Sequence, residues 1–217
     1  MDFDRLPDLA PQIWDRLLEH IELTVLSVVI GFVISFPLAI LAHRQRWFFP
    51  PVTITTGLLY TIPSLALFML LGPWTGLLSQ TTAVIGLVSY TLLILIRNIV
   101  AGLNAVPSDV KEAAQGMGYS GTQLLWRVEL PLAIPVIMAG VRLATVSTIG
   151  LVTVAAFIGN GGLGTFILRG FNFFDQTQLV IGSVLSMALA VVVDGLLSLS
   201  ERRLTPWARR RTVRAAG

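Results

Sequence analysis

The sequence predicts an all-α membrane protein with about five transmembrane helices and one helical hairpin between the third and the fourth. Three observations support this fold class. The chain is 54% hydrophobic with a mean hydropathy of +0.79, and only 12% of its 217 residues are charged, about half the charged fraction of soluble domains. Five apolar stretches are long enough to cross a bilayer as helices. The longest polar interval separates the third stretch from the fourth and carries helix-start signals.

The apolar stretches divide the chain into three parts. Residues 1–20 are polar and acid-rich, residues 21–199 form the transmembrane domain, and residues 200–217 form a basic tail. The predicted spans are 21–42, 52–71, 83–100, 132–158 and 179–199. The 22 residues of the first span would rise about 33 Å as a helix, which matches a hydrocarbon core of about 30 Å.

Prolines and small residues are expected to shape these spans. Pro37 is expected to kink the first span, and Pro63 to interrupt the second. Small residues are expected to let helices pack closely; these are Gly31, Gly57, Gly86, Gly140, Ala144 and Gly150.

The distribution of positive charge predicts the orientation of the chain. Of the 15 Lys and Arg residues, eleven lie on the side of the 107–131 loop and the C-terminal tail, three lie on the opposite side, and Arg142 lies within a span. Cytoplasmic loops carry the excess of Lys and Arg. We therefore expect an extracytoplasmic N-terminal segment, and a cytoplasmic 107–131 loop and C-terminal tail.

The 107–131 loop carries two helix-start signals in tandem. Asp109 stands three residues before Glu112, and Ser120 stands three residues before Gln123. Each pair fits a capping box, in which a short side chain caps the first turn and the acid or amide reaches back to it. The loop is therefore predicted to be a helix–turn–helix hairpin, with Pro131 at the end of its second helix.

The first predicted helix of the hairpin has one apolar side. Gly116 and Gly118 are expected to end this helix and to make the turn. Its apolar residues recur at helical spacing: Val110, Ala113, Ala114 and Met117.

The loop resembles the cytoplasmic loop of bacterial ABC importer permeases. That family's pattern is Glu-Ala-Ala, three residues, Gly, nine residues, Ile, one residue, Leu-Pro. Glu112-Ala113-Ala114, Gly118, Val128 and Leu130-Pro131 keep every spacing, with Val for Ile as the single departure. The resemblance implies the type I ABC importer permease fold, with this loop as the coupling helix seated in a groove of a separate ATPase. The residues it assigns to ATPase coupling are Asp109, Lys111, Glu112, Ala113, Ala114, Gln115 and Gly118.

A glycine-rich stretch at residues 155–164 carries a second resemblance. It reads Ala-Ala-Phe-Ile-Gly-Asn-Gly-Gly-Leu-Gly and is similar to a stretch of importers for methionine and for quaternary-ammonium osmoprotectants. Segments 103–107, 112–118, 128–132 and 139–146 are similar to the osmoprotectant branch. The resemblance covers roughly residues 20–200 and implies import of glycine betaine, choline or carnitine. A permease for methionine or another amino acid is the alternative.

Six residues are candidates for the translocation path. Glycine lets chains approach closely, and aromatic faces suit a cationic substrate. The aromatic side chains also suit lipid-facing or packing roles, and the glycine stretch also suits an ordinary loop with tight turns. The candidates are Tyr60, Tyr90, Phe157, Asn160, Gly161 and Gly162.

The sequence argues against an enzyme. The chain has no cysteine, one lysine, no phosphate-binding loop ending in Lys-Ser or Lys-Thr, no paired carboxylates, no metal-ligand spacing and nothing that resembles a nucleic-acid module. No cofactor is expected in this chain. The resemblance implies that a partner ATPase dimer binds ATP and Mg, that a substrate-binding protein delivers the substrate, and that a second permease completes a homodimer or heterodimer in the bacterial inner membrane. A non-ABC channel or scaffold is the alternative class.

Two ionisable residues lie inside the predicted spans. Arg142 and Asp194 are both expected in the cytoplasmic half of the membrane, at depths that differ by about 6 Å on the helical rise. Ionisable groups inside spans are functional or paired by default. One hypothesis is a buried polar contact between the fourth and fifth spans. The alternative is that each side chain reaches the interface or a backbone carbonyl.

Overall fold

The structure is a computed structural model, and it describes residues 6–206. Residues 1–5 of the acid-rich segment and 207–217 of the basic tail lie outside the described residues. Every regular element within 6–206 is helical. In chain order these are α1 (Leu6–Arg44), α2 (Phe49–Thr61), α3 (Ser64–Thr75), α4 (Gln80–Asn104), α5 (Ser108–Gly116), α6 (Gly121–Leu124), the π-helical turn η2 (Leu125–Glu129), α7 (Leu130–Val154), the 3-10 turn η3 (Ala155–Ile158), α8 (Gly164–Asn172) and α9 (Gln176–Leu204).

Among the described residues, four helical segments are long and apolar enough to cross a membrane, or five if a bent pair counts as one span. The four are Leu9–Arg44, Gln80–Asn104, Gly121–Ile158 and Gln176–Leu204. The first continues through Pro37 and begins well before the expected residue 21.

The bent pair, α2 and α3, occupies the expected second span. The two helices meet at 99°. Ile62 is extended because Pro63 follows it. A proline disfavours the helical conformation in the residue before it and has no N–H to continue the helix. The 13 residues of α2 rise only about 20 Å, so α2 alone is too short for a core of about 30 Å.

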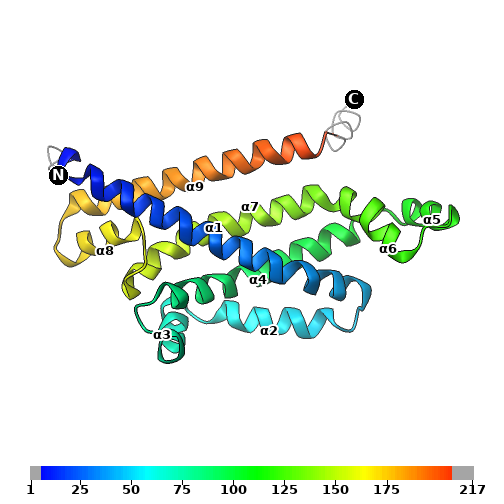
Figure 1. The fold of residues 1–217 in the computed structure, drawn as a ribbon, viewed down its shortest axis with the longest axis horizontal. Coiled ribbons are helices and arrows are strands. Elements are labelled where there is room, and N and C mark those ends of the chain that lie inside the picture. The colour runs from blue at the N-terminus through cyan, green and yellow to red at the C-terminus, as the bar shows by residue number, and fades with distance from the viewer. Residues whose placement is uncertain (1–5, 207–217) are drawn as a thin grey trace.

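Helix α4 is the centre of the bundle and packs against α1, α2, α3 and α7 (Figure 1). In the most apolar 18-residue stretch of α4, 67% of the residues are buried, whereas the corresponding shares are 33% for α1 and 17% for α9. Leu87, Leu95, Ile96 and Ile99 of α4 are fully buried. The core is therefore built around α4, and α9 lies at its margin.

Small residues let the helices around α4 approach it. A Cβ on Gly31 of α1 would overlap the Thr91 side chain, and one on Gly140 of α7 would overlap Asn98. The expected packing role therefore holds at these positions. At Gly57 and Gly150 an added Cβ would meet no atom of this chain within 4 Å, so the expectation stays a prediction at these two positions.

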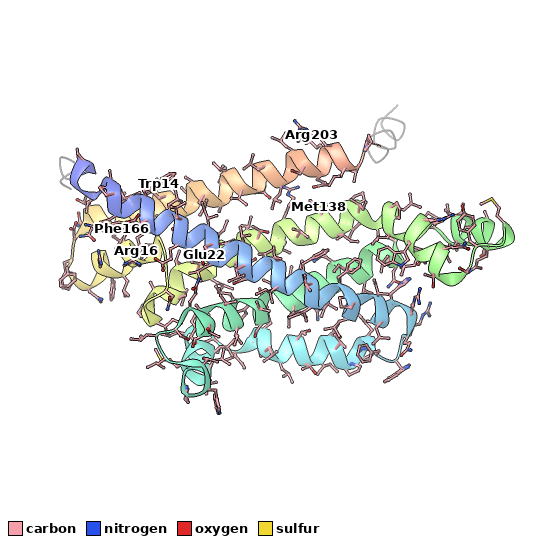
Figure 2. The ribbon with its side chains drawn as sticks, viewed as in Figure 1. Trp14, Arg16, Glu22, Met138, Phe166 and Arg203 are labelled. Atoms are coloured by element: carbon pink, nitrogen blue, oxygen red, sulfur yellow. The ribbon has the colours of Figure 1, made fainter. Side chains whose placement is uncertain are left out.

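The two ends of the bundle differ. Helices α5 and α6 project from one end, and α8 lies at the other, beside the start of α1 (Figure 1). Figure 2 shows Trp14, Arg16 and Phe166 at the α8 end, and Arg203 towards the hairpin end of α9. The hairpin is thus separated from the glycine-rich stretch by the length of the spans.

Candidate functional site

The α5–α6 hairpin, defined here as residues 108–129, is the candidate functional site. Helix α5 starts at Ser108, two residues earlier than expected, and Pro107 occupies its N-cap position without a side-chain cap. The predicted capping box of Asp109 and Glu112 is therefore wrong. Pro107 fixes where the helix begins, and this places Asp109 inside the first turn, where its charge still complements the helix dipole.

The turn between α5 and α6 forms as the glycines predict. The Tyr119 N–H donates to the Ala114 carbonyl at 3.2 Å, and the Gly118 N–H donates to the Gln115 carbonyl at 2.9 Å. These two bonds make the Schellman arrangement that ends many helices. Gly118 has φ +85°, a conformation that glycine adopts at little cost.

The second predicted capping box is confirmed. The Ser120 N–H donates to Gln123 Oε1 at 2.8 Å, and the Gln123 N–H donates to Ser120 Oγ at 3.4 Å. The expectation that Pro131 ends this helix is wrong, because α6 passes through the π-helical turn η2 directly into α7. Pro131 lies in the first turn of α7, where a missing N–H costs little.

The outer surface of α5 is open. Ala114 is the one buried residue of α5, while Met117, beyond its end, is 72% exposed. The expected apolar stripe is therefore left mostly uncovered by this chain. The exposed residues assigned to ATPase coupling are Asp109, Glu112, Ala113, Gln115 and Gly118.

Lys111 turns to its own chain instead. Its Nζ lies 2.9 Å from Glu129 Oε1 and donates to the Leu103 carbonyl at 3.2 Å. The Glu129 side chain is only 8% exposed, and His43 Nε2 lies 3.4 Å from the same oxygen. His43 Nδ1 lies 2.8 Å from Asn104 Oδ1. We call Lys111, Glu129, His43 and Asn104 the Glu129 node.

The contacts of the Glu129 node were not predicted from the sequence. A buried carboxylate must be paired, and the chain's one lysine stands in the same loop as Glu129. These two facts were the available signal. His43 and Asn104 gave none, because they come from the ends of α1 and α4.

A second polar cluster joins α7 to α9. Arg142 Nε and one terminal nitrogen donate to the two Asp194 carboxylate oxygens, both at 2.9 Å. The other terminal nitrogen donates to Glu201 Oε2 at 3.1 Å. The hypothesised contact of Arg142 with Asp194 is therefore present, and Glu201 is an unexpected third member. All three side chains are partly exposed, at 29%, 37% and 24% in that order.

Residues 24–206 match the family described as the binding-protein-dependent transport system inner membrane component. The chain belongs to this family. It is 35% identical over 188 residues to the glycine betaine/carnitine/choline transport system permease protein OpuCB of Bacillus subtilis, covering 87% of this chain and 86% of that protein. It is 38% identical over 192 residues to the osmoprotectant import permease protein OsmW of Salmonella typhimurium, covering 87% and 89%.

Solved structures confirm the expected fold class. A chain of the MetNI methionine ABC transporter in an inward-facing conformation has a TM-score of 0.82 at 21% identity, covering 94% of this chain and 100% of that chain. This permease therefore has the type I ABC importer permease fold. It is a multi-pass membrane protein and a transport subunit rather than an enzyme. Among residues 6–206, no group of three or more His, Asp or Glu side chains could hold a metal ion.

At the other end of this permease, the glycine-rich stretch packs on α1. The Leu163 N–H donates to His20 Nδ1 at 3.3 Å. His20 Nε2 therefore carries the ring proton and donates to the Ile149 carbonyl at 3.0 Å. A Cβ on Gly162 would lie 2.6 Å from His20 Cβ. Gly161 and Gly162 are buried within the chain, so here they serve packing.

The four remaining candidates for the translocation path differ in how exposed their side chains are. Tyr90 is 4% exposed, its hydroxyl donates to the Ile62 carbonyl, and its ring meets that of Tyr60 edge-on at 5.7 Å. Asn160 donates to the Leu78 carbonyl at 2.9 Å. Tyr60 and Phe157 are 42% and 53% exposed. Tyr90 therefore fixes the break between α2 and α3, while Tyr60 and Phe157 are the two with open aromatic surface.

Proposed function

We propose that this chain is the permease subunit of an ATP-driven importer of a small quaternary-ammonium osmoprotectant: glycine betaine, choline or carnitine. The observation that carries the proposal is the α5–α6 hairpin. Its motif is complete at every spacing, it projects from one end of the bundle, and its outer side chains are exposed. A helix placed in this way suits a groove on a separate ATPase.

The proposed substrate class rests on the relatives. Permeases that share 35% to 38% identity with this chain carry the names of glycine betaine, carnitine, choline or osmoprotectant systems. The methionine transporter shares the fold at 21% identity, and at that level the likeness concerns the fold alone. A methionine or other amino-acid substrate is therefore the second candidate.

The proposed assembly contains several partners. An ATPase dimer would bind ATP and Mg at the hairpin end, because the chain has no phosphate-binding loop of its own. A substrate-binding protein would deliver the substrate at the α8 end. A second permease, identical or homologous, would cover surfaces that this chain leaves open, since only 17% of the α9 window is buried. The excess of Lys and Arg on the hairpin side supports a cytoplasmic hairpin.

The proposal is tested by reconstituting the permease with its ATPase and binding protein in liposomes. Uptake of radiolabelled glycine betaine, choline, carnitine and methionine is measured with and without internal ATP. We expect ATP-dependent uptake of at least one quaternary-ammonium compound. Uptake of methionine alone would establish the second candidate instead.

Variants of the hairpin separate an ABC importer from a channel or scaffold. Glu112→Arg is expected to abolish uptake and to weaken co-purification with the ATPase. Arg203→Gln, an exposed change near the same end on α9, is the matched control. Uptake at a normal rate after residues 109–125 are replaced by a flexible linker would refute the ATP-driven mechanism.

A further inference from the structure

Helix α5 is attached to the rest of the chain by polar contacts as well as by packing. Ala114 is its one buried residue, so apolar packing holds α5 only weakly. The polar contacts of α5 with the bundle include those that Lys111 makes with Glu129 and with the Leu103 carbonyl of α4. A force applied to α5 therefore reaches the spans mainly through this polar side chain and the chain connections at its two ends.

Glu129 stands where these connections converge. It is the last residue of η2, at the point where the hairpin becomes α7. One of its oxygens faces both Lys111 of α5 and His43 of α1, at 2.9 and 3.4 Å, and His43 faces Asn104 of α4 at 2.8 Å. The Glu129 node thus links α5, α1 and α4 to η2, the turn that leads into α7.

The node is not tightly enclosed. A cavity of about 490 Å³ adjoins it, and His43, Arg46, Asn104 and Lys111 line this cavity. Close-packed side chains would resist a relative movement of the helices. The cavity leaves room for α5 to shift while the long Lys111 side chain keeps its hold on Glu129.

We propose that Glu129 is a positioning residue that transmits movement of α5 to the inner ends of α1 and α4, with Lys111 as its link. This role rests on the proposed function, because it requires an ATPase that moves α5. In the assembled transporter, loss of the link would let the ATPases close without carrying the spans with them. ATP hydrolysis would then continue while transport falls.

A purely structural role for the pair makes a different prediction. If the ion pair only stabilised the fold, its loss would lower uptake and ATP hydrolysis together, in proportion to the folded protein that remains. The ratio of substrate imported to ATP hydrolysed separates the two roles. This ratio does not depend on the amount of active complex.

The test uses the full complex in liposomes, with glycine betaine uptake and binding-protein-dependent ATP hydrolysis measured in the same vesicles. Lys111→Met and Glu129→Gln should lower the uptake per ATP by about twofold to thirtyfold, the range of coupling changes seen for such links. Lys111→Arg should retain most of the ratio. The exchange of charges, Lys111→Glu with Glu129→Lys, should recover it in part. Arg203→Gln, an exposed change on α9 that leaves the hairpin and the Glu129 node intact, is the control.

An unchanged ratio in both single variants would overturn the proposal. If the Glu129→Gln complex does not assemble, the ratio measured for Lys111→Met tests the proposal, because the Lys111 side chain is more exposed than that of Glu129. A wild-type complex without binding-protein-dependent hydrolysis would count against the proposed function rather than against this link.

Discussion

Two glycines of α7 allow a matched test of how closely the permease helices pack. A Cβ at Gly140 would overlap Asn98 of α4, whose side-chain amide is held by a 2.8 Å bond to the Ile94 carbonyl. A Cβ at Gly150 of the same helix would meet nothing within 4 Å. Gly140→Ala and Gly150→Ala therefore make the same chemical change in a closed and an open position.

Gly150→Ala should raise the free energy of unfolding, whereas Gly140→Ala should leave it unchanged or lower it. Alanine in place of glycine inside a helix stabilises by about 1 kcal/mol, and this gain applies to both. Gly140→Ala also overpacks the contact of α7 with α4, which costs about 1–3 kcal/mol. Gly150→Ala should therefore be stabilising, and the difference between the variants should be about 1–3 kcal/mol.

The assay is equilibrium unfolding of the isolated permease in mixed micelles, titrated with SDS and followed by tryptophan fluorescence. Equal changes for both variants, within about 0.5 kcal/mol, would show that Asn98 yields without cost and would refute the close-packing argument. A destabilising Gly150→Ala would mean that a neighbouring subunit covers this position.

Three further outcomes are expected. Ser120→Ala should remove the confirmed cap and lower the free energy of unfolding of the hairpin by about 1 kcal/mol, seen as faster amide hydrogen exchange in α6. His20→Leu should leave the buried Leu163 N–H without its acceptor, at a cost of about 1–3 kcal/mol, in the same SDS titration. Arg142 donates two bonds to Asp194 and one to Glu201. Asp194→Asn removes the charge and one of the two acceptor oxygens, whereas Glu201→Gln removes the charge but keeps an acceptor oxygen, so Asp194→Asn should lower the thermal midpoint more. Exchanging the charges of Asp194 and Arg142 should restore part of that loss.

The features that the sequence predicted are those set by neighbouring residues. Hydropathy over about 20 residues marks a span, so four of the five expected spans have a continuous helix. The Ser120 capping box and the turn at Gly118 were likewise predicted from a few adjacent residues. The failures involve proline: Pro107 fixed the start of α5, and Pro131 was absorbed into a helix start.

Distant contacts could not be read from local patterns. The pairing of Arg142 with Asp194 was reached by comparing depths in the membrane, which is a coarse but global constraint. The same reasoning gave no sign of Glu201, which lies beyond the expected end of the fifth span. No local pattern marked Glu129 as buried, and its burial follows from the unforeseen continuation of α6 into α7.

The exposure of α9 supports the proposed two-permease assembly. Only 17% of its window is buried, against 67% for α4. Lipid could cover the apolar part of that surface, such as Met187 and Val191 at 65% and 67% exposure. It could not cover the partly open ion cluster of Asp194 with its partners, because ionised groups in spans face protein or water rather than hydrocarbon. The ion cluster therefore calls for a second subunit or a water-filled path on this side of α7 and α9. The proposed two-permease assembly provides both, because the second permease covers apolar surface of α9 and the two permeases enclose the path.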